Sequence, residues 1–463
     1  MSKKFYFNAF EMNCVGHQSP GLWAHPRDRS WQYKDLEYWV ELAQKLEKGF
    51  FTAFFIADVI GYYDVYNNNA KAAVRSGAQI PVNDPLQIAA PVAYATKHIG
   101  IGVTSSTTFE HPYTFARRIA TADHYTKGRV GWNIVTSYLE SGAHNIGAKN
   151  LGEHDSRYEI ADEYARVIYK LLEGSWEDDA VVRDREKRIF ADPDKVHEIG
   201  HKGKYFDVPG IGLTEPSPQR TPVLFQAGVS EAGQDFAAKH AEAAFISGPE
   251  KSGIKNLVTS IRAKRAALGR DPHSILIFNI ITIVVDETDE KAQAKFKEYQ
   301  QYISQEGALA LLSGWTGEDF GKYKPTDLAK NVDLGAGSSF VDYLTHGQDK
   351  DWTIEDVARW VGIGGPGPVF VGSPTTVADA LEDWVDTTDV DGFNVAYAVS
   401  HETFEDVIKY LVPELQKRGV YPTSYKDGTL REKLFGYKKL PNDHPAAQYR
   451  DIEKVKREEA KQR

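Results

Sequence analysis

The chain has 463 residues, of which 41% are hydrophobic and 26% charged, as in an ordinary globular protein. Its net charge of −10 argues against a nucleic-acid partner, because nucleic-acid binding needs a basic face. The single cysteine, Cys14, excludes an intrachain disulfide and argues against a cysteine-based metal site. We find no signal-peptide core and no apolar run long enough to span a membrane, so we expect a cytoplasmic protein without a membrane partner.

Short β-branched or aromatic runs alternate with longer amphipathic segments along the chain. This alternation is typical of parallel strands joined by crossover helices. Several runs are apolar on consecutive residues, as in Ala53–Ile56, which indicates strands covered on both faces. The predicted strands are Lys4–Phe10, Phe51–Ala57, Ile99–Thr104, Arg129–Val135, Pro222–Gln226, Ala243–Ser247, Ile275–Val285 and Gly392–Ala396.

Apolar residues at helical spacing mark the segments between these strands. The predicted helices are Leu36–Lys48, Asp84–Lys97, Thr114–Thr126, Ser156–Leu172, Glu231–His240, Lys255–Leu268, Glu290–Tyr302, Thr375–Val385 and Phe404–Arg418. Asp84-Pro85 and Ser373-Pro374 have the form of helix starts, a capping residue followed by proline. Gly419 follows two basic residues and predicts a helix end.

The strand count and the lack of an internal break favour a closed eight-stranded parallel β/α barrel over a doubly wound sheet. We assign residues 1–450 to this single barrel. Two connections, 173–221 and 305–372, are too long for simple crossovers and are predicted to act as lids or binding elements. Residues 451–463 carry charges of both signs and are predicted to form a solvated helix or a frayed tail.

The residues that follow each strand are the first candidates for a site, because β/α barrels place their active sites at the carboxyl ends of the strands. Asp58 follows the second strand and Thr104 ends the third. Thr136-Ser137-Tyr138 follows the fourth, and Ala227-Gly228-Val229-Ser230 follows the fifth. This set is rich in hydroxyls and amides, and it has neither metal-ligand spacing nor a Gly-X-Ser-X-Gly elbow. It suits a cofactor held by hydrogen bonds better than it suits hydrolysis.

Gly228 and Ser230 stand directly before a predicted helix. Glycine allows close approach of the backbone, and the free amides of a helix start favour a phosphate. The alternative is that Ser230 only caps the helix, which is the commoner role of such a turn.

His154, Asp155, Ser156, Arg157 and Tyr158 also stand at a predicted helix start. One interpretation is that Asp155 or Ser156 caps the helix while His154 and Arg157 are solvated. The other places His154, Arg157 and Tyr158 around a phosphate, with the guanidinium supplying paired donors. Spacing alone favours the capping interpretation.

Cys14 and His17 follow the first strand. A lone cysteine is more often a small buried hydrophobe than a nucleophile. His17 is a candidate for proton transfer or substrate contact, with a structural hydrogen bond as the alternative. Aromatic residues that could line an apolar cavity or pack loops are Tyr62, Tyr63, Tyr66, Trp315 and Trp352.

Six motifs spread along the chain occur together in one known family. They are residues 8–17 (NAFEMNCVGH), Ala57–Val59 with Tyr63–Tyr66, Pro81–Pro85, Gly128–Ser137, His154–Tyr158 and Glu215–Pro222. Jointly they resemble the nitrilotriacetate monooxygenase branch of the bacterial luciferase-like flavoproteins. The likeness extends to about Arg450.

This resemblance implies a barrel that binds reduced FMN, delivered by a separate NAD(P)H:flavin reductase, and activates O2 to oxygenate a small-molecule substrate. It also implies a homodimer or homotetramer. The cofactor residues it implies are Asp58, Thr104, Ser137, Tyr138, His154, Arg157, Tyr158, Gly228, Val229 and Ser230. The candidate catalytic residues are His17, Tyr63 and Tyr138, and the candidate substrate-pocket residues are Met12, Cys14, Tyr63, Gln79 and Phe245. Closing a dry pocket over the flavin would give the two insertions roles as lid and wall.

Within this branch, the chain is most similar to the dimethyl sulfide and long-chain alkane monooxygenases. Tyr138 and Leu311 stand where the alkane enzymes carry histidines, so terminal alkane hydroxylation is not expected. The sequence therefore predicts a two-component, reduced-FMN-dependent monooxygenase acting on a sulfide, alkyl or amine substrate. Three alternatives stay open: a flavin-degrading enzyme similar to riboflavin lyase, a flavin-binding barrel without turnover, and a barrel that uses a deazaflavin as hydride carrier.

Overall fold

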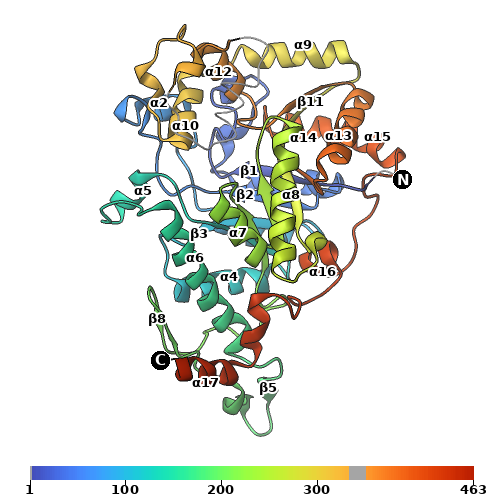
Figure 1. Cartoon of the computed structure of the whole chain (residues 1–463). Coiled ribbons are helices and arrows are strands. Elements are labelled where there is room, and N and C mark those ends of the chain that lie inside the picture. Colours follow the sequence, from blue (N-terminus) through green and yellow to red (C-terminus); the bar gives the residue numbers. More distant parts are fainter. Residues whose placement is uncertain (1–2, 333–350, 463) are drawn as a thin grey trace.

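A closed barrel of parallel strands forms the centre of the molecule in a computed structural model, which describes residues 3–332 and 351–462 (Figure 1). Eight strands pair in the order β10-β9-β4-β3-β2-β1-β13-β11, and a further pairing of β10 with β11 closes the ring. The strands are β1 (Tyr6–Met12), β2 (Ala53–Ala57), β3 (Gly100–Ser106), β4 (Val130–Val135), β9 (Val223–Ala227), β10 (Ala243–Ile246), β11 (Leu276–Val285) and β13 (Gly392–Ala396). The predicted eight-stranded barrel is confirmed.

One strand lies outside the ring. β12 (Val369–Gly372) pairs in parallel with the second half of β11, from Thr282 to Val285. The ten-residue length of β11 makes this possible, because its first half already pairs with β13 and β10. The residues of β12 belong to the predicted insertion 305–372, for which no strand was predicted.

Helices cover the outside of the barrel, as the amphipathic spacing predicts (Figure 1). They are α1 (Leu36–Lys48), α3 (Leu86–Ala95), α4 (Pro112–Tyr125), α6 (His154–Tyr169), α7 (Glu231–His240), α8 (Lys251–Ala267), α9 (Asp289–Gln300) and α13 (Pro374–Thr388). The last predicted helix is divided into α14 (Glu402–Asp406), a π-helical turn (Val407–Leu411) and α15 (Val412–Lys417). Short helices α2 (Lys71–Ser76) and α5 (Glu140–Asn145) lie in the connections.

The predicted helix ends are also confirmed. Ser373 caps α13, its hydroxyl accepting the amide of Thr376 at 3.3 Å. Asp84 accepts the amide of Leu86 at 2.9 Å at the start of α3. Gly419 follows α15 with φ of 77°, a left-handed conformation that glycine adopts without strain.

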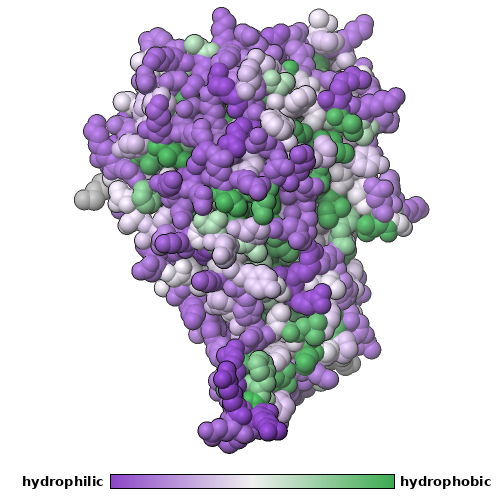
Figure 2. All heavy atoms as spheres, turned by 180° about the vertical axis from the view of Figure 1, so that it is seen from behind, coloured by the Kyte–Doolittle hydropathy of each residue, from purple (hydrophilic) through white to green (hydrophobic). Residues whose placement is uncertain are grey.

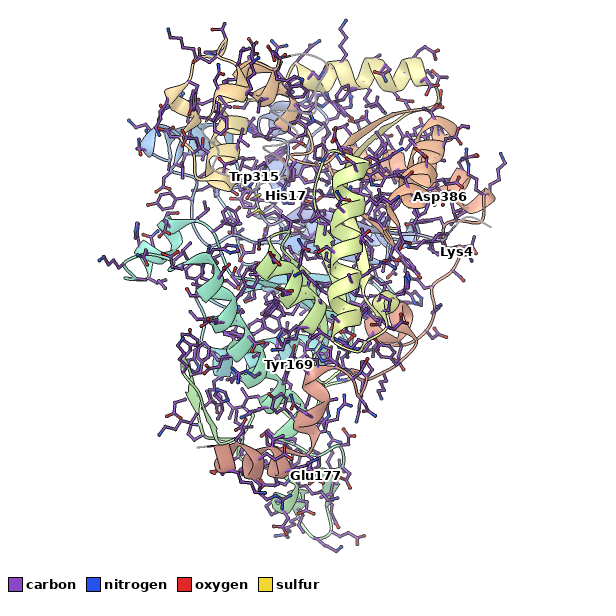
Figure 3. The ribbon with its side chains drawn as sticks, in the orientation of Figure 1. Lys4, His17, Tyr169, Glu177, Trp315 and Asp386 are labelled. Carbon is purple, nitrogen blue, oxygen red and sulfur yellow. The ribbon has the colours of Figure 1, made fainter. Side chains whose placement is uncertain are left out.

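The insertion 173–221 forms two antiparallel hairpins away from the carboxyl ends of the barrel strands. They pair β5 (Val181–Asp184) with β6 (Ile189–Ala191), and β7 (His201–Lys202) with β8 (Asp207–Val208). Glu177 of this insertion lies at the opposite end of the molecule from His17 and Trp315 (Figure 3). The hairpin of β5 and β6 is therefore not a lid or wall of the site, whereas Lys204 and Tyr205, between β7 and β8, line a separate pocket together with Tyr158 and Ser230.

The insertion 305–372 lies beside the carboxyl ends of the strands. It contains α10 (Gln305–Thr316) and α12 (Ile354–Val361), which pack around a small apolar core of their own. The part of the predicted insertion from 333 to 350 lies outside the described residues. This insertion supplies one side of the cavity described below, as expected for a wall.

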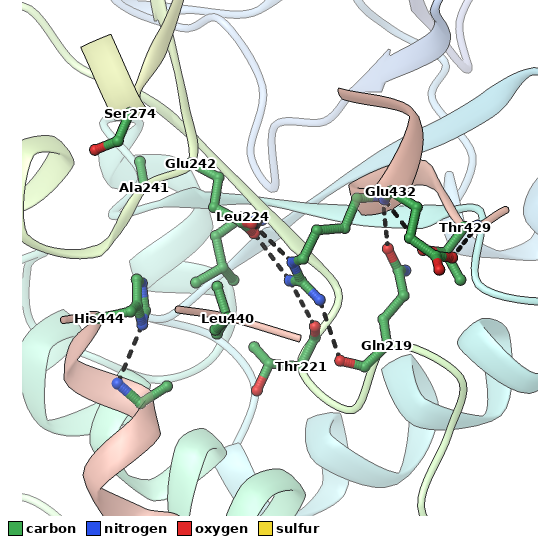
Figure 4. A network of polar contacts seen from close by, with 12 residues as sticks. Gln219, Thr221, Leu224, Ala241, Glu242, Ser274, Thr429, Glu432, Leu440 and His444 are labelled. Carbon is green, nitrogen blue, oxygen red and sulfur yellow. Dashed lines mark hydrogen bonds and ion pairs between the residues drawn. The ribbon is translucent and has the colours of Figure 1, made fainter. Parts of the chain in front are cut away.

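The amino end of the barrel is closed by α16 (Leu430–Phe435). Leu430 packs against an aromatic layer inside the barrel formed by Phe55, Phe225, Phe245 and Phe278. The next residue, Arg431, forms a buried ion pair with Glu242 at 2.7 Å and donates to the carbonyls of Gln219 and Thr221 (Figure 4).

The charged C-terminal segment forms α17 (Ile452–Gln462), which agrees with a helix. It is not fully solvated, because Ile452 and Val455 are buried and Glu459 pairs with the buried Lys170 at 2.7 Å. From behind, the surface is largely hydrophilic with separate apolar patches (Figure 2). In the described part of the chain, we find no helix with the length and apolar character needed to cross a membrane.

Candidate functional site

A cavity of about 490 Å³ opens at the carboxyl ends of the barrel strands. Its walls are mostly apolar, and all eight barrel strands and α10 contribute residues to them. The apolar lining includes Phe10, Met12, Phe55, Val59, Phe245, Ile280, Leu312, Trp315 and Pro366. The polar lining includes His17, Gln18, Asp58, Gln79, Thr104, Asn133, Tyr138 and Asn394. A few polar groups in an apolar cavity are typical of a site for a flat organic ligand.

A smaller pocket of about 260 Å³ continues from this cavity toward α6. The two share five residues: Asp58, Val59, Val135, Tyr138 and Ala227. The smaller pocket adds Ser106, Thr136, Ser137, His154, Arg157 and Tyr158. The site is therefore bipartite, with a larger apolar part and a smaller part rich in hydrogen-bond donors.

Arg157 and Ser137 both line the smaller pocket. Ser137 has φ of 61°, and its hydroxyl lies 2.7 Å from that of Ser106. Arg157 donates to the carbonyl oxygen of Ser137. Helix α6 begins at His154 and is preceded by Glu153, so Asp155 and Ser156 lie within its first turn. The capping interpretation of this segment is wrong, because Arg157 reaches into the pocket instead of lying in solvent.

The turn Gly228–Ser230 brings backbone amides to the same region. Ser230 caps α7, its hydroxyl accepting the amide of Gly233 at 3.1 Å. A Cβ on Gly228 would lie 2.5 Å from Nε2 of Gln226 and 2.8 Å from the hydroxyl of Tyr158. Only glycine allows the backbone to approach Tyr158 so closely. The capping role of Ser230 is thus present, and the turn also faces Tyr158 across the pocket.

Among the described residues, Asp58 is the one carboxyl group that lines both parts of the site. Burial raises its pKa to about 7, with a further contribution from the negative charge of Asp84 and an opposing one from the amide of Val59. A carboxyl with this pKa exchanges its proton near neutral pH.

Tyr63 is the centre of a hydrogen-bonded group at one end of the cavity. Its hydroxyl donates to Oε1 of Gln79 at 2.8 Å and accepts from the indole nitrogen of Trp315 at 3.2 Å. Because the Tyr63 proton is used on Gln79, the hydrogen shared with the adjacent Tyr138 hydroxyl comes from Tyr138. Tyr138 is 41% exposed as a residue, but its hydroxyl contacts the buried Tyr63, and burial raises its pKa to about 12. The two candidate catalytic tyrosines are both neutral at neutral pH.

His17 is buried at the cavity wall, and its ring contacts Phe10 edge-on with centroids 4.4 Å apart. The Gln18 side-chain amide lies 3.1 Å from His17 Nε2, so this ring nitrogen accepts a hydrogen bond. Burial lowers the His17 pKa to about 3. His17 is therefore a neutral polar contact, and the structure gives no support to a role as a proton donor near pH 7.

Three of the predicted pocket residues, Met12, Gln79 and Phe245, line the cavity. Tyr63 does not line the cavity itself, but its hydroxyl contacts that of Tyr138, which does. Cys14 is buried and is not part of the lining; its amide bonds to the carbonyl of Met12 at 2.7 Å, and burial raises its thiol pKa well above the ordinary value. Its placement gives no support to a substrate contact.

Two buried asparagines in the cavity lining were not predicted from the sequence. Asn133 donates to the hydroxyl of Thr104 at 2.9 Å, and its own carbonyl oxygen has no partner among the described residues. Asn394 accepts a hydrogen bond from Asn8 at 2.9 Å. An amide inside an otherwise apolar strand, at a position facing the barrel interior, is the pattern that could have identified both.

A group of possible metal ligands lies outside this cavity. Among the described residues, ligand atoms of Glu41, His401 and Glu405 lie within 4.8 Å of one another. Arg29 and Lys45 pair with Glu41, and Lys45 also pairs with Glu405. These cations already balance the two carboxylates, so the group needs no metal ion.

Comparison with known proteins agrees with this geometry. The sequence matches the luciferase-like monooxygenase family over residues 10–390. It is 51% identical to the dimethyl-sulfide monooxygenase of Hyphomicrobium sulfonivorans, covering 97% of this chain and 95% of the relative. It is 50% identical to the long-chain alkane monooxygenase of Geobacillus thermodenitrificans, covering 98% and 99%. The nitrilotriacetate monooxygenase component A of Aminobacter aminovorans is more distant, at 32% identity over 89% of this chain and 93% of the relative.

Solved structures give the same grouping. The crystal structure of the Hyphomicrobium enzyme superposes with a TM-score of 0.93 over 97% of this chain and 96% of its own. A riboflavin lyase crystallised with modified FMN and riboflavin is 35% identical, with a TM-score of 0.89 over 96% and 99%. An F420-dependent secondary alcohol dehydrogenase, at 15% identity and a TM-score of 0.55, shares the fold alone. The chain belongs to the luciferase-like monooxygenase family and is a flavin-dependent monooxygenase.

Proposed function

We propose that the flavin is FMN, that it arrives reduced from a separate flavin reductase, and that the chain uses it with O2 to oxygenate a small organic substrate. The observation that carries this proposal is the bipartite site, in which the apolar cavity shares Asp58 and Tyr138 with the smaller pocket of hydrogen-bond donors. An isoalloxazine ring suits the first part and a ribityl phosphate the second. The name "component A" of the nitrilotriacetate relative supports a two-component system.

The hydrogen-bond donors of the smaller pocket fit a phosphate. Arg157 and Tyr158 line this pocket, and the turn at Gly228 approaches the hydroxyl of Tyr158 so closely that it leaves no space for a side chain. Anions are stabilised at helix N-termini by free amides and by the helix dipole, and both α6 and α7 begin here. Arg157 would supply a charge-assisted donor, and Tyr158 a hydroxyl.

Bound reduced flavin supplies the two electrons that activate O2. The chain positions the ring with Asp58, Thr104 and Asn133, and the apolar walls exclude water from the reacting atoms. The group formed by Tyr63, Tyr138, Gln79 and Trp315 fixes the hydroxyl of Tyr138 at one end of the cavity. Neutral hydroxyls and amides orient the substrate here without introducing a charge.

We further propose a sulfide, alkyl or amine substrate of small or medium size. The apolar side chains Met12, Phe245, Ile280 and Leu312 favour a substrate with little polarity. Leu311 packs in an apolar cluster with Tyr63 and Leu139, so it offers no basic group to the cavity. This supports a reaction other than terminal alkane hydroxylation. The 32% identity to the nitrilotriacetate relative supports our further proposal that the chain belongs to the same branch.

The test uses the purified chain, photoreduced FMN and O2 with a panel of sulfides, alkanes, amines and riboflavin. We expect substrate-dependent O2 consumption and a product that contains one added oxygen atom, identified by mass spectrometry. Recovery of every substrate unchanged would contradict the proposal. Cleavage of riboflavin alone would favour a flavin-degrading function, which the 35% identical riboflavin lyase makes the second candidate.

Asp58→Ala is the sharpest single variant for the site. We expect it to weaken binding of reduced FMN or to abolish turnover, because Asp58 lines both parts of the site. Circular dichroism should show an intact fold. Wild-type affinity and rate in the folded variant would contradict the placement of the flavin.

A further inference from the structure

A third pocket, of about 500 Å³, lies on the other side of Asp58, between the loop after β2, the start of α3 and the start of α4. We call it the outer acidic pocket and define it by Asp58, Asp84, Ser106, Glu110 and Arg118. It shares Asp58, Val59 and Thr104 with the 490 Å³ cavity. The Asp58 side chain therefore forms part of the wall between the two spaces.

The outer acidic pocket is in contact with solvent. The side chains of Asp84, Arg118 and Glu110 are 44%, 36% and 21% exposed. Arg118 bridges the other two, at 3.0 Å to Asp84 and 2.6 Å to Glu110. Polar, solvent-exposed side chains therefore lie beside Asp58, whose carboxyl also faces the apolar cavity.

The proposed reaction needs a proton from solvent. With S as substrate and the reduced flavin as its anion, S + O2 + FMNH⁻ + H⁺ gives SO + FMN + H2O. One oxygen atom goes to the substrate, and the other takes the flavin hydride and the proton and leaves as water. Among the described residues that line the cavity, the groups that titrate are His17, Asp58 and Tyr138. His17 is neutral with its Nε2 accepting from Gln18, and the Tyr138 proton is committed to Tyr63.

We propose that Asp58 carries this proton, taking it from water in the outer acidic pocket and releasing it into the cavity. This inference rests on the proposed function. The carboxyl is the only acid that touches both spaces in the described structure. Its pKa of about 7, raised by burial and then by Asp84, allows it to be loaded and emptied near neutral pH.

The groups that face Asp58 come from three sides. They are Asp84, Glu110 and Arg118 in the outer acidic pocket, His17 and Tyr138 in the cavity, and His154, Arg157 and Tyr158 toward α6. Asp84 is the one whose negative charge raises the Asp58 pKa. Asp84→Asn removes this charge and keeps the side-chain oxygen that accepts the Leu86 amide at the start of α3, so the fold should be retained.

The first experiment needs neither flavin nor turnover. In protein labelled with ¹³C at the aspartate carboxyls, the Asp58 resonance is assigned by its loss in Asp58→Asn and titrated by NMR. We expect a midpoint near 7 in the wild type, and a midpoint lower by about half a pH unit in Asp84→Asn. A wild-type midpoint at the ordinary value of 3.8 would overturn the proposal.

The second experiment measures coupled product formation against pH. The protonated acid is the active form, so the rate should fall as pH rises through the Asp58 pKa, and Asp84→Asn should move this fall to lower pH by the same amount as the NMR midpoint. Asp235→Asn, on α7 and paired with Lys264, is the matched control and should leave the fall in place. If Asp84→Asn forms product but its rate falls at the same pH as that of the wild type, the proposed proton route is overturned and the proposed function is not. If the wild type forms no product from any substrate of the panel, the proposed function is overturned and this inference with it.

Discussion

Gly228 shows how a single missing side chain shapes the site. A methyl group at this position would overlap the hydroxyl of Tyr158 and the side-chain amide of Gln226. We expect Gly228→Ala to weaken FMN binding about tenfold or more, equivalent to about 1.4 kcal/mol, since the turn must move away from the phosphate donors. Flavin fluorescence quenching measures the affinity.

Gly253→Ala is the matched control for this variant. Gly253 lies in α8, and a Cβ there has nothing within 4 Å. Equal FMN affinity in both alanine variants would show that the close approach at Gly228 has no part in cofactor binding.

The residue scale also shows what the sequence could not predict. The order of residues after each strand placed Asp58, Thr104, Tyr138 and Gly228 at the rim of the cavity. The capping interpretation of His154–Tyr158 failed because it depended on where α6 begins, and capping patterns alone do not determine a helix start to within one or two residues. The protonation states of His17 and Asp58 depend on burial by distant segments, which no local pattern records.

At the scale of the element, α16 closes the amino end of the barrel through a buried ion pair. Arg431 is fully buried, and it pairs with Glu242, which also accepts the Leu224 amide at 3.0 Å. We expect Arg431→Met to lower the free energy of unfolding by about 3–5 kcal/mol, because it leaves the Glu242 charge buried without its cation. Denaturant titration followed by circular dichroism measures the change.

Two further variants make this test specific. Adding Glu242→Gln to Arg431→Met removes the unpaired charge and keeps an acceptor for Leu224, so part of the stability should return. Arg75→Met breaks the exposed pair with Glu306 and should cost no more than about 1 kcal/mol. Equal losses from Arg431→Met and Arg75→Met would contradict a stabilising role for the buried pair.

The eight barrel strands and the helices around them could be predicted from local sequence, because the strands are short runs of apolar residues and the helices repeat apolar residues at helical spacing. Elements whose structure depends on pairing or packing with distant parts of the chain could not be predicted. β12 is a four-residue strand that exists because β11 extends beyond the ring. The 173–221 insertion was predicted to be a candidate lid from its length. Its sequence does not show at which end of the barrel its hairpins lie.

At the scale of the whole molecule, buried histidines make stability depend on pH. Burial, helped by the cations of Arg29 and Lys45, lowers the His401 pKa from 6.5 to about 3. Between these values the unfolded chain binds the proton and the folded chain does not, so this contribution to stability is present above pH 6.5 and is lost as pH falls. We expect His401→Phe, which keeps a ring against Tyr38, to make the unfolding free energy less steep in pH by up to about 1.4 kcal/mol per unit.

This prediction is checked by denaturant titrations of both proteins from pH 4 to 7. Comparing the two proteins isolates His401, because Asp28, whose pKa burial raises to about 6, acts in the opposite direction in both. Parallel curves for the wild type and the variant would show that His401 takes up a proton as easily in the folded protein as in the unfolded chain.

The closed amino end of the barrel has a consequence for kinetics. With Leu430 and the aromatic layer filling that end, flavin and substrate both reach the site from the carboxyl end of the strands. A substrate molecule that enters before the reduced flavin then occupies the path the ring must take. We expect compulsory-order kinetics, with flavin first, and inhibition at high substrate concentration that excess reduced flavin relieves.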